Sequence, residues 1–479
     1  MSTYPLTREA VSYSWRQLLT RAGADPDQLP LTLSYGENTA PSSRAKVIIR
    51  RCEASAARAL LERAPNSLDW LPVSEVVPAG SALPISEPIP ILFWGKGADQ
   101  GHLPFASQRA DGTIEFHADL IAAVFFMLSR WEETVVAEQD EHGRFPGVAS
   151  VAYRQGFLDR PVVDEYALIL CEWLRVILPG WEPKPRSFSV KLSHDVDYIR
   201  RYANAQTVLQ AVGGHLLKRR SPKMAWRAGL DAVRERLAPE QAPYFLGIAY
   251  LARMSQEHGL GRDAFYFMAT EPAALDNDYR LASPMILRTI EDLRKQGFEI
   301  GLHAGYHTLH NPERFMEEKA KLDNILGETP YGGRQHYLRF KVPHTWRCWE
   351  QAGLSYDSTM AFADHEGFRC GTCHPFRPFD IEQNREMDLW ELPLLVMEYT
   401  LSQYRGLSPS NGETRILALA HRCQQVGGTF TLLWHNSSLD DQWQPWARMY
   451  LRVLDYLAEL GPRAPNLAVA ESESRPLAT

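Results

Sequence analysis

From about residue 187 onward, apolar strand-like runs alternate with helical segments, and this alternation constrains the fold of the chain most strongly. Strand candidates are SFSVKLSHDVD, DAFYFMA, GFEIGLHAGYH, HYLRF, LSYDSTM, LWELPLLVM and GTFTLLWHN. A strand followed by a helix and another strand favours a mainly parallel sheet. Polar residues cluster where these strands end, which is where open α/β sheets and β/α barrels place their chemistry. The sequence therefore predicts an α/β fold with its site at the carboxyl ends of the strands.

At 479 residues the chain is long enough for two or three domains. Residues 1–185 read as an N-terminal α+β domain, and the Pro-rich GWEPKPR marks its end. The second domain is predicted over 186–465, with a helical insertion near 200–245 that we expect to be a solvated cover over the sheet. Residues 466–479 form a polar tail.

A net charge of -7 and a pI near 6.1 argue against a nucleic-acid-binding protein. The start of the chain lacks a basic segment followed by an apolar run, and no apolar run reaches membrane-spanning length, so we expect a cytoplasmic protein. The segment CGTCH, 370–374, matches the pattern of c-type haem attachment and contains a C-x-x-C pair. Its position in a Gly- and Pro-rich loop favours ordinary thiols, with a second metal site as the alternative.

Two polar pairs follow separate strands and suggest a metal. His303 and His307 lie four apart in EIGLHAGYHT, and Asp195 and Asp197 lie two apart in LSHDVDY. A spacing of two places both carboxylates on one side of an extended strand, where they repel unless a cation lies beside them. Either pair alone is more typical of turns or packing, but imidazoles with a carboxylate form the ligand set of zinc.

Two further motifs complete a pattern. Arg334 follows two glycines in YGGRQHY, and His435 ends the strand TFTLLWH. The order D-x-D, H-x-x-x-H, R-x-H-Y, L-x-H over residues 187–445 resembles the polysaccharide deacetylases of the NodB-homology type, carbohydrate esterase family four. The strings GFEIGLHAGYH and YDST resemble the branch found with bacterial surface-polysaccharide genes. Residues 1–185 resemble the extra N-terminal domain of that branch, whose role the resemblance does not imply.

The resemblance implies a distorted (β/α) barrel and a divalent metal, most often Zn²⁺, together with a role for each motif residue. The implied assignments are Asp197, His303 and His307 as metal ligands, Asp195 as catalytic base, Arg334 as the residue that orients this base, Tyr337 as a backbone oxyanion donor, and His435 as general acid. Val196 separates two aspartates that are usually adjacent, which leaves an exchange of their roles open. His336 stands where the arginine motif usually has proline, and Arg339 is the competing choice for the arginine.

The resemblance also implies an activity, the metal-dependent removal of an acyl group from an amino sugar in polysaccharide or glycan-precursor metabolism. N-acetyl is the first candidate for the acyl group. Other C–N hydrolases on the same fold, such as sugar deformylases, and a non-catalytic carbohydrate-binding protein are the alternatives. The expected cytoplasmic location favours a nucleotide sugar or a lipid-linked glycan as substrate over an extracellular polymer. The sequence leaves the sugar, the acyl group, the metal and the oligomeric state open.

Overall fold

The computed structural model describes residues 4–36, 45–97, 103–203, 205–218, 220–273, 275–327, 329–441 and 443–462. Its main feature is an eight-stranded parallel sheet in the order β14-β11-β10-β9-β8-β7-β16-β15, curled into a half-barrel. The strands are β7 (Ser189–Val196), β8 (Ala264–Met268), β9 (Glu299–Ala304), β10 (Gly333–Gln335), β11 (Tyr356–Asp357), β14 (Trp390–Glu391), β15 (Val396–Met397) and β16 (Thr429–Leu433). The predicted α/β class with a barrel-like parallel sheet is confirmed.

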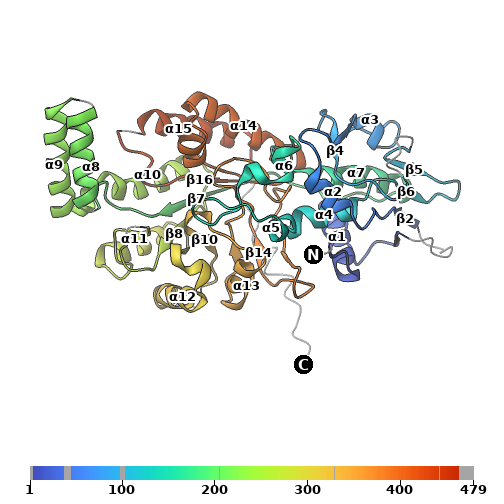
Figure 1. Cartoon of the computed structure of the whole chain (residues 1–479), viewed down its shortest axis with the longest axis horizontal. Coiled ribbons are helices and arrows are strands. Elements are labelled where there is room, and N and C mark those ends of the chain that lie inside the picture. Colours follow the sequence, from blue (N-terminus) through green and yellow to red (C-terminus); the bar gives the residue numbers. More distant parts are fainter. Residues whose placement is uncertain are drawn as a thin grey trace.

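Helices pack on the outside of this sheet (Figure 1). Five of them carry proline in the first turn, where its missing N–H costs no hydrogen bond. The helices are α10 (Pro243–Glu257), α11 (Pro284–Lys295), α12 (Pro312–Leu326), α13 (His344–Gln351), α14 (Pro409–Val426) and α15 (Gln444–Glu459). The smaller elements are η3 (Pro239–Gln241), η4 (Tyr306–His310), η5 (His336–Leu338), η6 (Thr400–Tyr404), β12 (Phe379–Asp380) and β13 (Arg385–Glu386). The predicted strand HYLRF is wrong: β10 ends before it, and the chain turns into η5, where Tyr337 and Leu338 have positive φ.

Residues 4–177 form the N-terminal unit, built on a mixed four-stranded sheet in the order β1-β2-β6-β5. Only the β5–β6 pairing of this sheet is antiparallel. The strands are β1 (Leu31–Tyr35), β2 (Ala45–Ile49), β3 (Asp69–Leu71), β4 (Ile89–Ile91), β5 (Ala106–Gln108) and β6 (Ile114–Phe116). The helices are α1 (Arg8–Arg21), α2 (Ala56–Glu62), α3 (Val73–Val76), α4 (Leu120–Ser129), α5 (Glu132–Val135), η1 (Gly147–Ala149), α6 (Val151–Arg154) and α7 (Val162–Ile177).

The insertion after β7 begins with α8 (Ala205–Gly213), η2 (Gly214–Lys218) and α9 (Pro222–Leu237). Figure 1 shows α8 and α9 projecting together at the end of the molecule opposite the N-terminal sheet. The expectation that the whole insertion covers the sheet is therefore wrong for these elements. The following helix, α10, packs on the body instead, through buried residues such as Ile248 and Leu251. No helix among the described residues is both long enough and apolar enough to cross a bilayer.

The N-terminal unit and the parallel sheet share one continuous hydrophobic cluster. Every residue of α4 is buried, and a charged network lies just beyond its end. The Arg369 guanidinium donates to both oxygens of Glu133, at 2.9 and 2.5 Å, and to the Ala361 carbonyl at 2.7 Å. Arg130 also donates to Glu133, at 2.8 Å, and its Nη1 donates to the Arg369 carbonyl. Buried charge therefore joins the two parts of the chain.

We predict that Arg369→Leu lowers the free energy of unfolding by about 3–5 kcal/mol, because it leaves a buried carboxylate without its main partner. Urea denaturation followed by circular dichroism measures this change. Arg16→Leu is the matched control, since Arg16 also joins the two parts, through Glu386, but its side chain is 44% exposed. Its loss should cost about 1 kcal/mol or less. Equal losses in the two variants would contradict a special contribution from the buried network.

Candidate metal centre

The carboxyl end of β7 places two aspartates at the edge of the parallel sheet. β7 is buried along its whole length, as expected for a strand with neighbours on both sides and helices over the sheet. Asp195 is the next-to-last residue of the strand, and Asp197 follows the strand directly. β7 is linked to β9 through β8, so both aspartates lie near the end of β9.

His303 stands near the end of β9 with its ring fixed by a backbone contact. Its Nδ1 lies 3.0 Å from the Arg334 carbonyl, and because a carbonyl can only accept, Nδ1 carries the hydrogen. Nε2 therefore faces the two aspartates, 3.1 Å from Oδ1 of Asp197 and 3.6 Å from Oδ2 of Asp195. The structure thus brings together Asp195, Asp197 and His303, as the sequence predicts.

The third member of the group is His336 in η5. Asp197, His303 and His336 each offer one ligand atom, and these atoms all lie within 4.8 Å of one another. The His336 Nε2 lies 3.8 Å from Oδ2 of Asp197, while its Nδ1 lies 3.4 Å from Oδ1 of Asp276. A carboxylate on the far ring nitrogen is the arrangement that commonly orients a metal-binding histidine.

The structure does not bring His307 to this group. β9 ends at Ala304, and Gly305 begins the short helix η4, which carries His307 on its exposed side. The neighbouring Tyr306 turns inward and stacks under the Arg339 guanidinium, 4.0 Å from the ring centroid. The turn at Gly305 therefore separates two histidines that a spacing of four would place together in a helix.

The electrostatics of the group suit a cation. Burial would raise the pKa of Asp197, but His336 and His303 hold it well below its usual range. Burial would lower the pKa of His336, but Asp197 outweighs it and raises this pKa to about 9. An environment that favours positive charge on an imidazole also favours a divalent ion in its place.

The surroundings of one oxygen atom in the group indicate whether a metal fits between these residues. Oδ1 of Asp197 is buried and has no hydrogen-bond partner in the part of the chain that the structure describes. The nearest group is Nε2 of His303, which carries a lone pair when Nδ1 holds the hydrogen, so two acceptors face each other at 3.1 Å. Such a contact is repulsive unless a proton or a cation lies between the atoms. One carboxylate and two imidazoles are also a usual zinc ligand set, so the residues fit the metal.

Arg334 is fully buried on β10 and holds Asp195. Its Nη1 donates to Oδ1 of Asp195 at 2.7 Å, its Nη2 donates to the hydroxyl groups of Ser193 and Ser358, and its Nε donates to the Ser358 carbonyl. Arg339, the competing candidate, instead donates to backbone carbonyls of His142 and Tyr306. The geometry therefore distinguishes the two arginines in favour of Arg334 at the aspartates.

His435 follows β16 and faces Asp197 from the opposite side to His303. Its Nε2 lies 3.6 Å from Oδ2 of Asp197, and its Nδ1 lies 2.8 Å from Oε1 of Glu398. Burial would lower the pKa of His435, but the Glu398 carboxylate outweighs it and raises this pKa to about 10. Sequence reasoning missed Glu398. The available signal was its position directly after the strand-like run LLVM, where the other site residues also follow their strands.

The N-terminal unit reaches this site through residues 140–144. Tyr337 adopts φ 59°, and its carbonyl accepts a hydrogen bond from Nη1 of Arg144 at 2.9 Å. The Tyr337 ring lies 4.7 Å from the ring of His142 and 5.2 Å from that of Tyr306. Aromatic rings from both parts of the chain therefore line one side of the candidate site, next to His336.

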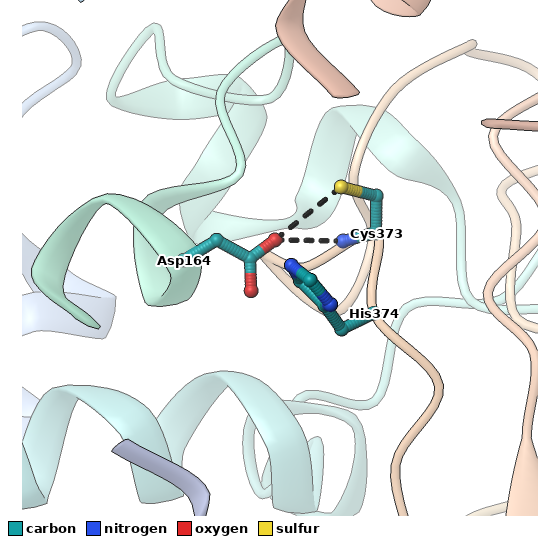
Figure 2. A group of neighbouring side chains, drawn as sticks. All are labelled: Asp164, Cys373 and His374. Atoms are coloured by element: carbon teal, nitrogen blue, oxygen red, sulfur yellow. Dashed lines mark hydrogen bonds between the residues drawn. The ribbon is translucent and has the colours of Figure 1, made fainter. Parts of the chain in front are cut away.

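A second group of possible ligands, Asp164, Cys373 and His374, joins α7 to the CGTCH loop (Figure 2). Asp164 accepts hydrogen bonds from the Cys373 amide at 2.9 Å, from its thiol at 3.5 Å and from the Thr372 hydroxyl at 2.6 Å. Buried Arg21 donates to the same carboxylate at 3.1 Å. Burial raises the pKa of the Cys373 thiol well above its ordinary value. Because the Asp164 carboxylate already accepts hydrogen bonds from several donors, including a guanidinium, it is better suited to joining the two parts of the chain than to binding a metal.

The comparisons with known proteins add little to this geometry. A family model described as a family of unknown function (DUF7033) matches residues 33–179, which is less than half of the chain and lies in the N-terminal unit. Among solved structures, a Mycobacterium smegmatis protein described provisionally as a polysaccharide deacetylase is similar, with a TM-score of 0.39 and 15% identity. The match covers 61% of this chain and 92% of that one, and at this similarity it bears on neither substrate nor chemistry. No curated protein matches the chain.

We predict that Asp164→Asn destabilises the protein without changing its metal content. The substitution leaves Arg21 buried beside a neutral group, which should cost about 3–5 kcal/mol of unfolding free energy. Urea denaturation measures the stability, and elemental analysis by inductively coupled plasma mass spectrometry measures the metal bound per chain. Loss of a bound metal in this variant would instead identify Asp164 as a ligand.

Proposed function

We propose that this chain is a metal-dependent hydrolase that removes an acyl group from an amino sugar, with N-acetyl as the first candidate for this group. One observation carries the proposal: Asp197, His303 and His336 converge between the Asp195–Arg334 pair on one side and the His435–Glu398 pair on the other. Hydrolysis of an amide needs an activated water, an ionised base and a protonated acid. The site offers residues of the right type for each of these needs.

The proposed metal ligands are Asp197, His303 and His336, with Zn²⁺ as the first candidate. Three protein ligands leave one coordination position for water or substrate, as catalytic zinc sites require. When bound, the metal would polarise the carbonyl of the substrate and lower the pKa of a water molecule. In this proposal His336 takes the place that sequence resemblance gave to His307.

Asp195 is the proposed base, and Asp197 keeps the role of ligand. Arg334 holds Oδ1 of Asp195 at 2.7 Å, which orients the carboxylate and leaves Oδ2 toward the ligand group. No arginine among the described residues pairs with Asp197, and its Oδ1 is a buried atom without a hydrogen-bond partner there. These two differences favour Asp195 as base and Asp197 as ligand over the exchange of these roles.

His435 is the proposed acid. Glu398 accepts the hydrogen on Nδ1 and thereby fixes the ring, so that Nε2 points toward Asp197 and the ligand group. A ring held in this way can deliver a proton from Nε2 to the departing nitrogen. Glu398 acts through His435 and is therefore a positioning residue.

The proposed substrate is an N-acylated sugar carried by a nucleotide or a lipid. The rings of Tyr306 and Tyr337 beside His336 supply surfaces of the kind that stack on sugar faces. His142 adds a ring from the N-terminal unit. Two large aromatic side chains of the same domain, Trp346 and Trp434, are fully buried in the core and offer no surface to a substrate.

We predict that His336→Ala loses bound Zn²⁺, whereas His307→Ala retains it. Removing one of three ligands should weaken zinc binding by at least roughly tenfold to a hundredfold, the effect seen even for residues that only orient a ligand. Isothermal titration of Zn²⁺ into the chelator-treated protein measures the affinity. Thermal unfolding of the metal-free variants shows whether both fold.

The opposite result, loss of zinc with His307→Ala and retention with His336→Ala, would overturn the ligand set. Retention of zinc by both of these variants, and also by His303→Ala, would overturn the metal centre itself.

We predict that Asp195→Asn strongly slows hydrolysis while zinc binding is largely kept. Loss of a general base should lower the rate by about 10²–10⁴. The assay follows release of acetate or formate, and the matching change in mass, from a panel of N-acetylated and N-formylated nucleotide sugars and lipid-linked glycans. Unchanged turnover in this variant, or no turnover by the zinc-loaded wild type across the panel, would contradict the proposed activity.

A further inference from the structure

The projecting element built from α8, η2 and α9, called the helical hairpin below, has no role in the site described above. It leaves the body at the carboxyl end of β7, a few residues beyond Asp197. Its base is anchored: Arg201 forms an ion pair with Asp440, and the Tyr202 amide donates to Glu235 of α9. The hairpin therefore follows the same strand end, that of β7, which carries Asp195 and Asp197.

The first arm of the hairpin is apolar but not buried. Residues 205–217 contain no Asp, Glu, Lys or Arg, and no residue of α8 is buried. Leu209 is 72% exposed and Leu217 is 82% exposed. A helix without charges normally gains its stability by burying its apolar side chains against other elements. This arm presents leucines to solvent instead.

The second arm, α9, carries an ordered apolar stripe. Trp226, Leu230, Val233 and Leu237 follow at intervals of four, three and four residues, which places all four on one helix face. All four are exposed, Trp226 by 72% and Leu237 by 81%. A groove of about 500 Å³ continues the apolar surface from this face onto the first arm. It is lined by residues that include Val212, Leu216, Trp226 and Leu230.

Basic side chains flank this stripe on both sides. With 100° per residue, Lys223, Arg227 and Arg234 fall along one side of the stripe and Arg236 falls along the other. The acidic residues of the helix lie toward the opposite face, although Asp231 approaches Arg234 at 3.5 Å. Over 205–237 the sequence has seven Lys or Arg and two acidic residues, in a chain whose net charge is -7.

We propose that the helical hairpin docks on an anionic lipid surface. An exposed apolar stripe with cationic flanks is the pattern of helices that lie in the membrane interface, with apolar side chains in the acyl boundary and Lys or Arg on the lipid phosphates. Tryptophan is also enriched at this depth. A second copy of the chain is the less favoured occupant, because two identical hairpins would bring basic flanks together.

Lipid binding by the hairpin requires neither a metal nor turnover, so it is independent of the proposed hydrolase activity. It does suggest where the substrate comes from. A hairpin that holds the edge of the sheet near a membrane would place the candidate site close to sugars that are linked to lipids.

The test is sedimentation of the full-length protein with two kinds of vesicle, pure phosphatidylcholine and a mixture with about 30% phosphatidylglycerol as the anionic lipid. We expect binding to the anionic vesicles, weakened at about 0.5 M salt, and little binding to the neutral ones. Trp226→Ser with Leu230→Ser should lower the partition coefficient at least roughly tenfold, because two buried apolar side chains are lost. Arg227→Glu with Arg234→Glu should lower it by a similar factor.

Matched controls come from exposed residues on the body. Met316→Ser on α12 removes a 45% exposed apolar side chain, and Arg288→Glu on α11 reverses a charge that is 69% exposed. Both should leave vesicle binding unchanged. Because the substituted hairpin residues are exposed, zinc affinity and thermal unfolding should also stay at wild-type values in all four variants.

Three results would overturn the proposal. The first is no binding of the wild type to either vesicle, and the second is binding that neither pair of hairpin substitutions reduces. The third is a concentration-dependent dimer in light scattering that Trp226→Ser abolishes, because the stripe would then face a second copy. Each result leaves the proposed hydrolase untouched, and failure of the hydrolase assay leaves the lipid result untouched.

Discussion

Arg334 organises the candidate site, because its side chain and its backbone act on different members of it. The guanidinium holds Asp195 from β7, and the carbonyl accepts the Nδ1 hydrogen of His303 from β9. Residues from three strands of the sheet, β7, β9 and β10, thus meet at Arg334. Arg334 is fully buried and stacks over Tyr266, so its position is set by packing as well as by hydrogen bonds. The protonation pattern that exposes Nε2 of His303 to the aspartates follows from this arrangement.

The N-terminal unit also helps to hold the candidate site in place. Its core is continuous with that of the parallel sheet, and its buried Glu133 and Asp164 accept hydrogen bonds from the other unit. Arg144 extends this contact to the site, since it holds the carbonyl of Tyr337 next to His336. A residue at φ 59° needs its surroundings to hold it there. The part of the chain that matches a family of unknown function therefore helps to shape the turn that carries a candidate ligand.

Much of the site was predictable because strand ends are visible in a sequence. Asp195, Asp197, His303 and His435 each lie at or directly after the end of an apolar run, and parallel strands bring such ends to one edge of a sheet. The fold class followed from the same alternation. His336 was harder to find, because it replaces a proline within a motif and lies in a turn with two left-handed residues. Turns of that kind depend on tertiary contacts, here with Arg144 and Asp276, that no local pattern encodes.

The helical hairpin shows a limit of periodicity as a guide to burial. Its spacing of apolar residues predicts a face that avoids water, and that prediction holds for any helix that packs on a protein core or lies on a membrane. Periodicity cannot distinguish the two, but the position of charge can. A helix on a protein core carries mixed charges on the side away from its apolar face, whereas α9 places cations beside its stripe and its acids on the far side. The apolar stripe of α9 is also exposed, Trp226 by 72% and Leu237 by 81%, whereas α10 buries its own apolar residues on the body.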